Sequence, residues 1–381
     1  MSKLFKNANI YVEGKGIIKT DLLFDKQILQ IGNDLVGEAI LLPEDAVVVP
    51  GFIDQHIHGA GGADAMDGTF EALNTIATTV AKEGTTSFLA TTMTQSPSNI
   101  SKAMSGIKDY IKKDVKDGAR LLGIHLEGPF ISTKSVGAQP IEYVAKMDSS
   151  VFDKYNIESG NNIKVITLAP EVENATEFIS HIASQGVVVS IGHTAGKYND
   201  VENAIKNGAK NVTHTYNAQS PLHHRDIGTV GSAMLFDDLN CELIADTIHV
   251  SIPAIKLLIK NKPKQKVTLI TDAMRAKGMP DGISELGGNT VYVKNGEARL
   301  EDGTLAGSVL KMNVAIKNLV EKVGIPYQDA IDFATINPAR NLGVDNLYGS
   351  IKEGKIADFT ILDKNFNVLF TIKNGEIIYK A

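Results

Sequence analysis

The sequence has no tryptophan and very little cysteine. Cys241 is the only cysteine among 381 residues, so the chain cannot form an internal disulfide. A lone thiol is typical of reducing compartments, and it predicts a cytoplasmic protein. Residues 1–16 lack the apolar stretch of a signal peptide, which agrees with this expectation.

Long hydrophobic runs and runs of one charge are also missing. No window approaches the roughly 18 apolar residues of a membrane span, so we expect no membrane insertion. The net charge is −6 and the Lys and Arg residues are scattered, which argues against a nucleic-acid or membrane-surface partner. The remaining composition, 43% hydrophobic and 22% charged, is that of a globular protein with a large core.

Short apolar runs recur through the middle of the chain, each followed by a loop and a stretch with helical spacing. Helical periodicity is clearest over residues 70–84 and 175–186. Alternating strands and helices predict an α/β protein with a parallel sheet, and eight such units fit a (β/α)8 TIM-type barrel. The eight runs cover residues 46–56, 86–92, 120–127, 163–171, 187–193, 210–218, 241–249 and 266–273.

The two ends of the chain differ from this middle part. Both contain short strand-like segments with turn signals between them, and neither can close a core alone. We therefore predict a small β-sandwich domain built from both termini, residues 1–48 and 350–381, beside a barrel catalytic domain over 49–349. Residues 274–308 interrupt the barrel rhythm with a predicted hairpin, and residues 309–343 contain the closing helices.

Side chains that bind metals stand at the ends of the predicted strands. His56 and His58 end the first run, Glu127 the third, His193 the fifth and His214 the sixth. Active sites of barrel enzymes lie at the C-terminal ends of the strands, so these residues are expected to converge. Residues two apart in a strand face the same side, so the first pair can reach one ion and the second pair another, with the carboxylate bridging them.

This set of side chains suits hydrolysis by metal-activated water. Imidazole and carboxylate bind zinc, iron, manganese or cobalt, and two ions about 3.5–4 Å apart make water a nucleophile at neutral pH. Asp272, at the end of the eighth run, is the candidate proton-transfer residue. Taken singly, a buried histidine is more often structural, and Glu127 or Asp272 could cap a helix. The conjunction of all six favours two divalent ions per subunit.

Several motifs resemble a known family. PGFIDQHIHG is similar to the metal-binding opening of the amidohydrolase superfamily, and essentially the whole chain resembles the N-acetylglucosamine-6-phosphate deacetylases. The resemblance implies hydrolysis of the acetamide of that phosphorylated amino sugar, five metal ligands (His56, His58, Glu127, His193 and His214), Asp272 as catalytic acid/base, and a homodimer. The motifs that carry it are HLEGPFI, GHT, THTYNAQSPLHHR, IHV, TDAMRAKG, LAGSVLKMN, NPAR and GSIKEGKIADFTILD.

The same resemblance implies substrate-binding positions. Arg225 would cross the dimer to the phosphate of the neighbouring site, and His249 would bind the ligand. Ala138 and Gln139 are implied to line the sugar. The backbone of Asn217 and Ala218 would approach the phosphate, and the loop of Leu305, Ala306 and Gly307 would close over the sugar.

Three positions depart from the family pattern. Gln139 stands where many members have histidine, Gln219 replaces a methionine, and Thr247 replaces a glycine. They leave open an N-acetylgalactosamine-6-phosphate deacetylase, or another amidohydrolase acting on a phosphorylated amide. The basic cluster at residues 223–225 favours a phosphorylated substrate over an uncharged cyclic amide. A non-enzymatic scaffold is disfavoured because every ligand and the acid are present.

Overall fold

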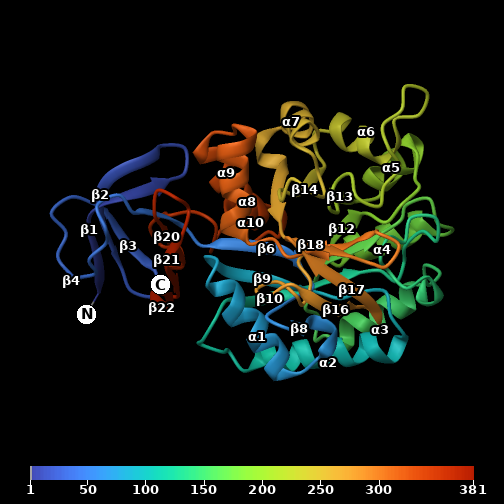
Figure 1. Cartoon of the computed structure of the whole chain (residues 1–381), viewed down its shortest axis with the longest axis horizontal. Helices are drawn as coiled ribbons and strands as arrows, with labels where there is room; N and C mark the ends of the chain where they lie inside the picture. Colours follow the sequence, from blue (N-terminus) through green and yellow to red (C-terminus); the bar gives the residue numbers. More distant parts are fainter. Residues whose placement is uncertain (1) are drawn as a thin grey trace.

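A computed structural model describes residues 2–381 and contains a central eight-stranded parallel sheet. The strands neighbour one another in chain order, as in a barrel, so the predicted (β/α)8 architecture is confirmed (Figure 1). They are β6 (Phe52–Ile57), β9 (Thr85–Thr91), β10 (Arg120–Glu127), β11 (Ile163–Leu168), β12 (Val188–Ile191), β13 (Ala209–Val212), β14 (Asn240–Ile244) and β15 (Val267–Ile270).

Side chains and loop backbone join the first strand, β6, to the last, β15. The Thr271 hydroxyl donates to Asp54 Oδ2 at 2.6 Å, and the Asp272 backbone N–H donates to the His56 carbonyl at 2.9 Å. Both strands come from distant parts of the sequence. The seam therefore brings the loop after β15 directly against the end of β6.

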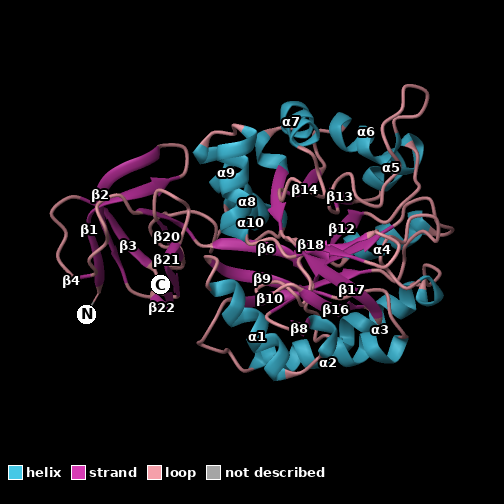
Figure 2. Cartoon of the chain, in the orientation of Figure 1, coloured by secondary structure: helices cyan, strands magenta, loops and turns pink. Residues whose placement is uncertain are grey.

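Helices surround the barrel on its outer side (Figure 2). Helix α1 shows why: its apolar residues Leu73, Ile76 and Val80 are buried, and the Thr69 hydroxyl caps its first turn by accepting from the Ala72 N–H at 3.2 Å. None of the helices within residues 2–381 is long and apolar enough to cross a membrane. The helices are α1 (Phe70–Ala81), α2 (Pro97–Lys112), α3 (Ser149–Glu158), α4 (Ala175–Ser184), α5 (Tyr198–Lys206), α6 (Gly228–Leu235), α7 (Ile252–Asn261), α8 (Met312–Asn318), α9 (Tyr327–Ala334) and α10 (Ile336–Asn341).

The chain ends form a separate sheet, on the left in Figure 1. Phe5, Phe24 and Phe359 pack in its core, with ring centroids 4.9 to 6.0 Å apart, so residues from both termini share one apolar centre. This confirms the predicted small β-domain. Its strands are β1 (Lys3–Val12), β2 (Gly16–Phe24), β3 (Ile28–Gly32), β4 (Glu38–Ala39), β5 (Val47–Pro50), β20 (Phe359–Leu362), β21 (Val368–Lys373) and β22 (Glu376–Lys380).

The first apolar run of the sequence is two strands instead of one. β5 belongs to the small sheet and β6 to the barrel, and Gly51 lies between them. A Cβ at this position would lie 2.2 Å from Thr86 Oγ1, so only glycine allows the close approach.

Residues 282–308 form a small antiparallel sheet next to the mouth of the barrel, which confirms and extends the predicted hairpin. Leu286, Val291 and Ala306 of this sheet pack against Met93 and Met274, so an apolar core attaches the sheet to the barrel. The strands are β16 (Gly282–Leu286), β17 (Asn289–Lys294), β18 (Glu297–Arg299) and β19 (Leu305–Ser308).

Candidate active site

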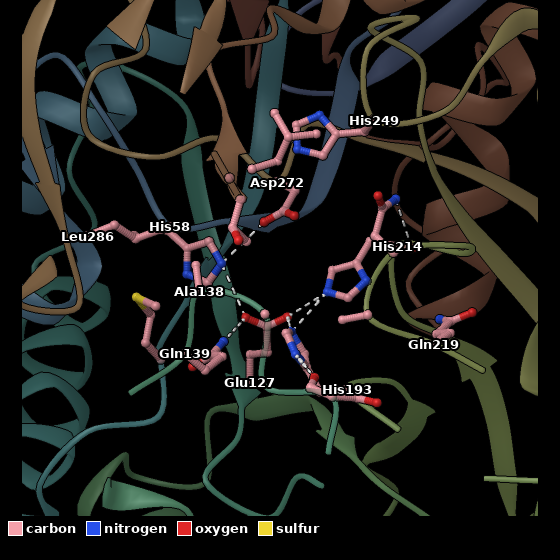
Figure 3. Close-up of a pocket in the computed structure, with 18 of the residues that line it drawn as sticks. His58, Glu127, Ala138, Gln139, His193, His214, Gln219, His249, Asp272 and Leu286 are labelled. Atoms are coloured by element: carbon pink, nitrogen blue, oxygen red, sulfur yellow. Dashed lines mark hydrogen bonds and ion pairs between the residues drawn. The ribbon is translucent and has the colours of Figure 1, made fainter. Parts of the chain in front are cut away.

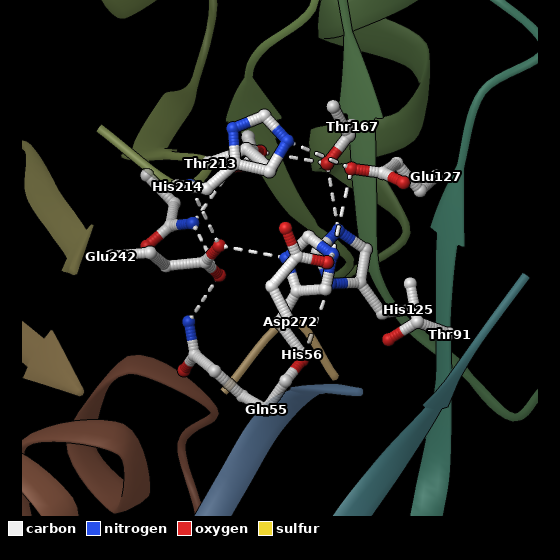
Figure 4. Close-up of polar contacts among 12 residues, drawn as sticks. Gln55, His56, Thr91, His125, Glu127, Thr167, Thr213, His214, Glu242 and Asp272 are labelled. Atoms are coloured by element: carbon white, nitrogen blue, oxygen red, sulfur yellow. Dashed lines mark hydrogen bonds and ion pairs between the residues drawn. The ribbon is translucent and has the colours of Figure 1, made fainter. Parts of the chain in front are cut away.

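The six predicted residues meet at the C-terminal mouth of the barrel. Each is buried, although the six come from five different strand ends (Figure 3 labels all of them except His56, which Figure 4 labels). His56 and His58 lie at the end of β6, and Glu127 ends β10. The other three follow their strands: His193 comes after β12, His214 after β13 and Asp272 after β15.

Glu127 occupies the centre of the cluster. Its Oε1 lies 3.1 Å from His214 Nε2, 3.3 Å from His193 Nε2 and 3.5 Å from His56 Nε2. Its Oε2 lies 3.3 Å from His58 Nε2. One carboxylate thus faces all four imidazoles, in the arrangement expected of a ligand shared between two ions.

Asp272 is close enough to the histidines to act as a metal ligand itself. Its Oδ1 is 3.2 Å from His58 Nε2 and 3.3 Å from His56 Nε2. Two groups of three side chains can therefore each hold an ion: His56, His58 and Asp272 in the first, and Glu127, His193 and His214 in the second. The sequence predicted only a proton-transfer role for Asp272, although its place at the eighth strand end was the signal for both.

The ring nitrogens fit a cation. His56 Nε2 is buried and has no hydrogen-bond partner among residues 2–381, yet it points at the oxygens of Glu127 and Asp272. A buried ring nitrogen that faces two carboxylates without a hydrogen bond is a costly arrangement, and positive charge at this position relieves the cost. The donor set, nitrogen and carboxylate oxygen, matches divalent transition metals.

The carboxylates and imidazoles of the cluster shift the pKa values of one another. Burial disfavours the charged imidazole, but Asp272 and Glu127 outweigh it and raise the pKa of His56 to about 9. Burial likewise disfavours the Glu127 carboxylate, but His56 and His193 hold its pKa well below the usual value. The site therefore keeps its carboxylates ionised and stabilises positive charge.

Three of these residues sit on unusual backbone. His193, His214 and Asp272 have φ values of 45°, 27° and 47°, in the left-handed region that residues other than glycine rarely adopt. Such conformations cost about 1–3 kcal/mol each and gather at functional sites. Here each follows a barrel strand, where an abrupt turn aims the side chain across the mouth.

A pocket of about 390 Å³ opens over the cluster, a size that suits a small ligand. Ala306 is not part of the lining because its side chain is buried in the core of the small antiparallel sheet. Arg225 lies outside the pocket on an exposed loop, with its Nη1 2.8 Å from His224 Nε2. Seven of the predicted substrate positions line the pocket: Ala138, Gln139, Asn217, Ala218, His249, Leu305 and Gly307.

Sequence reasoning missed other residues of this lining. Part of the wall comes from Met93, Lys134, Leu286 and Thr304, and the Ser135 carbonyl lies 3.0 Å from His193 Nδ1. They carry no motif, and their presence depends on how the loops fold over the mouth.

The three departures from the family pattern have defined contacts. Gln139 Nε2 donates to Glu127 Oε2 at 2.6 Å, while its Oε1 accepts from the Thr94 backbone N–H at 2.7 Å, so this amide holds the central carboxylate. Gln219 Nε2 donates to the Thr213 carbonyl at 2.6 Å and closes the loop after β13. Thr247 has a φ of 69°, which is strained for a β-branched residue.

His249 is held by a neighbouring carboxylate. Its Nδ1 lies 2.6 Å from Asp246 Oδ2, and Asp246 Oδ1 accepts the backbone N–H groups of Ile248 and His249 at 2.8 Å. The turn after β14 thereby fixes one ring nitrogen and leaves the other side of the ring toward the pocket (Figure 3).

Comparisons with known proteins agree with this geometry. The amidohydrolase family matches residues 47–378. The N-acetylglucosamine-6-phosphate deacetylase of Bacillus subtilis (strain 168) is 44% identical over 345 residues, covering 90% of this chain and 87% of that protein. The N-acetylgalactosamine-6-phosphate deacetylase of Escherichia coli O157:H7 is 38% identical and covers 84% of this chain and 85% of that protein.

Solved structures extend the likeness to three dimensions. The N-acetylglucosamine-6-phosphate deacetylase of Pasteurella multocida superposes with a TM-score of 0.94 at 32% identity, over 100% of both chains. A mutant of the Mycobacterium smegmatis enzyme in complex with N-acetyl-D-glucosamine-6-phosphate superposes with a TM-score of 0.93 at 27% identity, again over 100% of both chains.

Proposed function

The chain belongs to the amidohydrolase family, and we propose that it hydrolyses the acetamide of N-acetylglucosamine 6-phosphate to glucosamine 6-phosphate and acetate. One observation carries the proposal: two groups of metal donors meet around Glu127 on the floor of a pocket of about 390 Å³. Relatives with this activity match over nearly the whole chain, which supports the same activity here.

Two divalent ions per subunit are part of this proposal. The first would be held by His56, His58 and Asp272, and the second by His193 and His214, with Glu127 contacting both groups. Zinc, iron, manganese and cobalt all suit these donors. When bound, such ions act as Lewis acids and make water nucleophilic near pH 7.

The protein's own groups then move the proton. Hydrolysis adds a hydroxyl group to the acetyl carbon and a proton to the leaving nitrogen, so a base must first take a proton from water. Asp272 is the group at the mouth that can accept this proton and deliver it to the nitrogen. Its backbone is fixed by the bond to the His56 carbonyl, which keeps the carboxylate in place for both steps.

The sugar phosphate would lie along the pocket wall. The segments at 138–139, 217–218 and 305–307, together with His249, are proposed to contact it, and all of these residues except Ala306 line the pocket. Arg225 is proposed to bind the phosphate held by a second copy of the chain, which requires a homodimer. Its exposed position outside its own pocket supports this role. The proposed location is the cytoplasm.

An activity screen tests the proposal. Acetate release would be measured from N-acetylglucosamine 6-phosphate and its galacto, manno and unphosphorylated counterparts, with metal content determined on the same samples. We expect the gluco 6-phosphate to have the highest kcat/KM. A higher value for the galacto compound would establish the alternative deacetylase activity, for which the 38% identical relative is the precedent. No acetate from any of them would reject a deacetylase.

A further inference from the structure

A third carboxylate, Glu242, lies beneath the metal donors inside the barrel (Figure 4). It belongs to β14 and is completely buried. Its neighbours Cys241 and Leu243 pack in the apolar core, so the alternation of the strand turns Glu242 toward the barrel interior. A fully buried charge needs a strong reason to be there, because its desolvation costs several kcal/mol.

Four donors converge on this carboxylate. Oε2 lies 3.1 Å from His56 Nδ1 and accepts the His214 backbone N–H at 3.2 Å. Oε1 accepts Gln55 Nε2 at 2.6 Å and Asn211 Nδ2 at 3.1 Å. One oxygen thus contacts a residue from each of the two proposed ion positions, and the other oxygen is anchored to the barrel interior.

The contact with His56 decides how that ring is used. A carboxylate at Nδ1 requires the hydrogen to be on Nδ1, which leaves the Nε2 lone pair free to bind an ion. The other three imidazoles have no carboxylate at Nδ1. The Nδ1 of His193 lies 3.0 Å from the Ser135 carbonyl, and the Nδ1 atoms of His58 and His214 have no hydrogen-bond partner among residues 2–381. For His214, the bond from its backbone to Glu242 takes the place of a ring anchor.

A third ion between His56, His125 and Glu242 is the competing explanation, because their donor atoms lie close together. Both nitrogens of His125 are already engaged, Nδ1 with the Gln55 carbonyl at 3.2 Å and Nε2 with the Thr167 hydroxyl at 2.7 Å. An ion there would have to break these bonds.

We infer that Glu242 is a positioning residue that sets the geometry of both metal positions, through the ring of His56 and the backbone of His214. This inference rests on the proposed two-ion site. Losing a partner of this kind weakens metal binding by about 10–100-fold. The effect should be greater at the His56 position, where the contact is to the coordinating ring itself.

Two variants test this role. Glu242→Gln keeps the shape but offers one acceptor oxygen to four donors and removes the charge, whereas Glu242→Met removes every acceptor. We expect metal titration of the metal-free protein to show binding weakened by about 10–100-fold for Glu242→Gln and more for Glu242→Met. The visible spectrum of the cobalt-loaded protein should change as well, because the ligand field of His56 is altered.

The matched control is Thr268→Val. The Thr268 hydroxyl is equally buried and donates to Asn240 Oδ1 at 2.9 Å in the same polar interior, but it contacts no metal donor. We expect this variant to lose some thermal stability and to keep wild-type metal affinity and cobalt spectrum. If it weakens metal binding as much as Glu242→Gln does, the effect is one of general stability and the inference is wrong.

Wild-type measurements separate this inference from the proposed function. If the wild-type protein does not bind two ions, the two-ion site itself fails. If it binds two ions and Glu242→Gln binds them with unchanged affinity and spectrum, only the role of Glu242 is rejected. Glu242→Gln decides the matter if Glu242→Met does not fold.

Discussion

Replacing Asp272 with asparagine removes the proposed proton carrier while keeping its size. An amide cannot accept the proton from water, and loss of a general acid–base group typically costs 10²–10⁴ in kcat. At about 1.36 kcal/mol for each factor of ten, this corresponds to about 2.7–5.4 kcal/mol in the activation barrier. Asp272 Oδ1 also lies 3.3 and 3.2 Å from His56 and His58 Nε2, so the ion proposed for these three residues would lose the only carboxylate of the group.

Metal content and kcat for Asp272→Asn should therefore be measured together. Because Asp272 is absent from the group formed by Glu127, His193 and His214, we expect that ion to be retained and the other to be weakened. Asp363→Asn, a change at a half-buried turn residue of the small domain, is the control and should leave kcat unaltered. A kcat for Asp272→Asn within threefold of wild type, with saturating substrate and metal, would refute the proton-transfer role.

Four further predictions follow from the same geometry. Thr247→Gly should stabilise the protein by about 1 kcal/mol, because glycine tolerates the φ of 69° that strains threonine; a lower Tm would contradict this. Glu127→Ala should bind neither ion tightly, since this carboxylate faces all four imidazoles, and full metal content by mass spectrometry would disprove a shared ligand. In the metal-free protein the raised pKa of His56, about 9 against an ordinary 6.5, stabilises the fold below pH 6.5, and this contribution is lost as the pH rises through 9. Metal binding near pH 8 should consequently release protons, and calorimetry in buffers of different ionisation heat should give unequal heats; equal heats would count against it. Arg225→Met should raise KM for the phosphorylated sugar about 10–100-fold with little change in kcat, as expected for a lost charged hydrogen bond, and an unchanged KM would remove Arg225 from phosphate binding.

The barrel could be predicted because its signals are local. Each unit joins a short apolar run to a stretch with helical spacing, and β9, β10 and α1 form where these patterns lie. The run at 46–56 predicted a single strand, whereas the structure has two, because the apolar pattern does not show that Gly51 divides the run between two sheets. That division depends on which neighbours β5 and β6 find in space.

The metal donors could be predicted for a similar reason. A histidine or carboxylate at the end of a parallel strand is placed at the mouth by the architecture alone, so His193 and His214 were identifiable before any contact was known. The contact of Gln139 with Glu127 was not, because it depends on the path of the loop after β10. The same holds for the wall residue Leu286, which is brought over the mouth by the inserted sheet.

The sequence by itself determined which residue types stand at the strand ends, because the two-residue and 3.6-residue periods act between close neighbours. The tertiary structure alone decided which of them touch. Closure of the seam through Asp54 and Thr271 places Asp272 beside His56, and the register of β14 turns Glu242 beneath the same ring. These partners are far apart in the chain, and their meeting depends on how the whole barrel closes and packs, which no local pattern specifies.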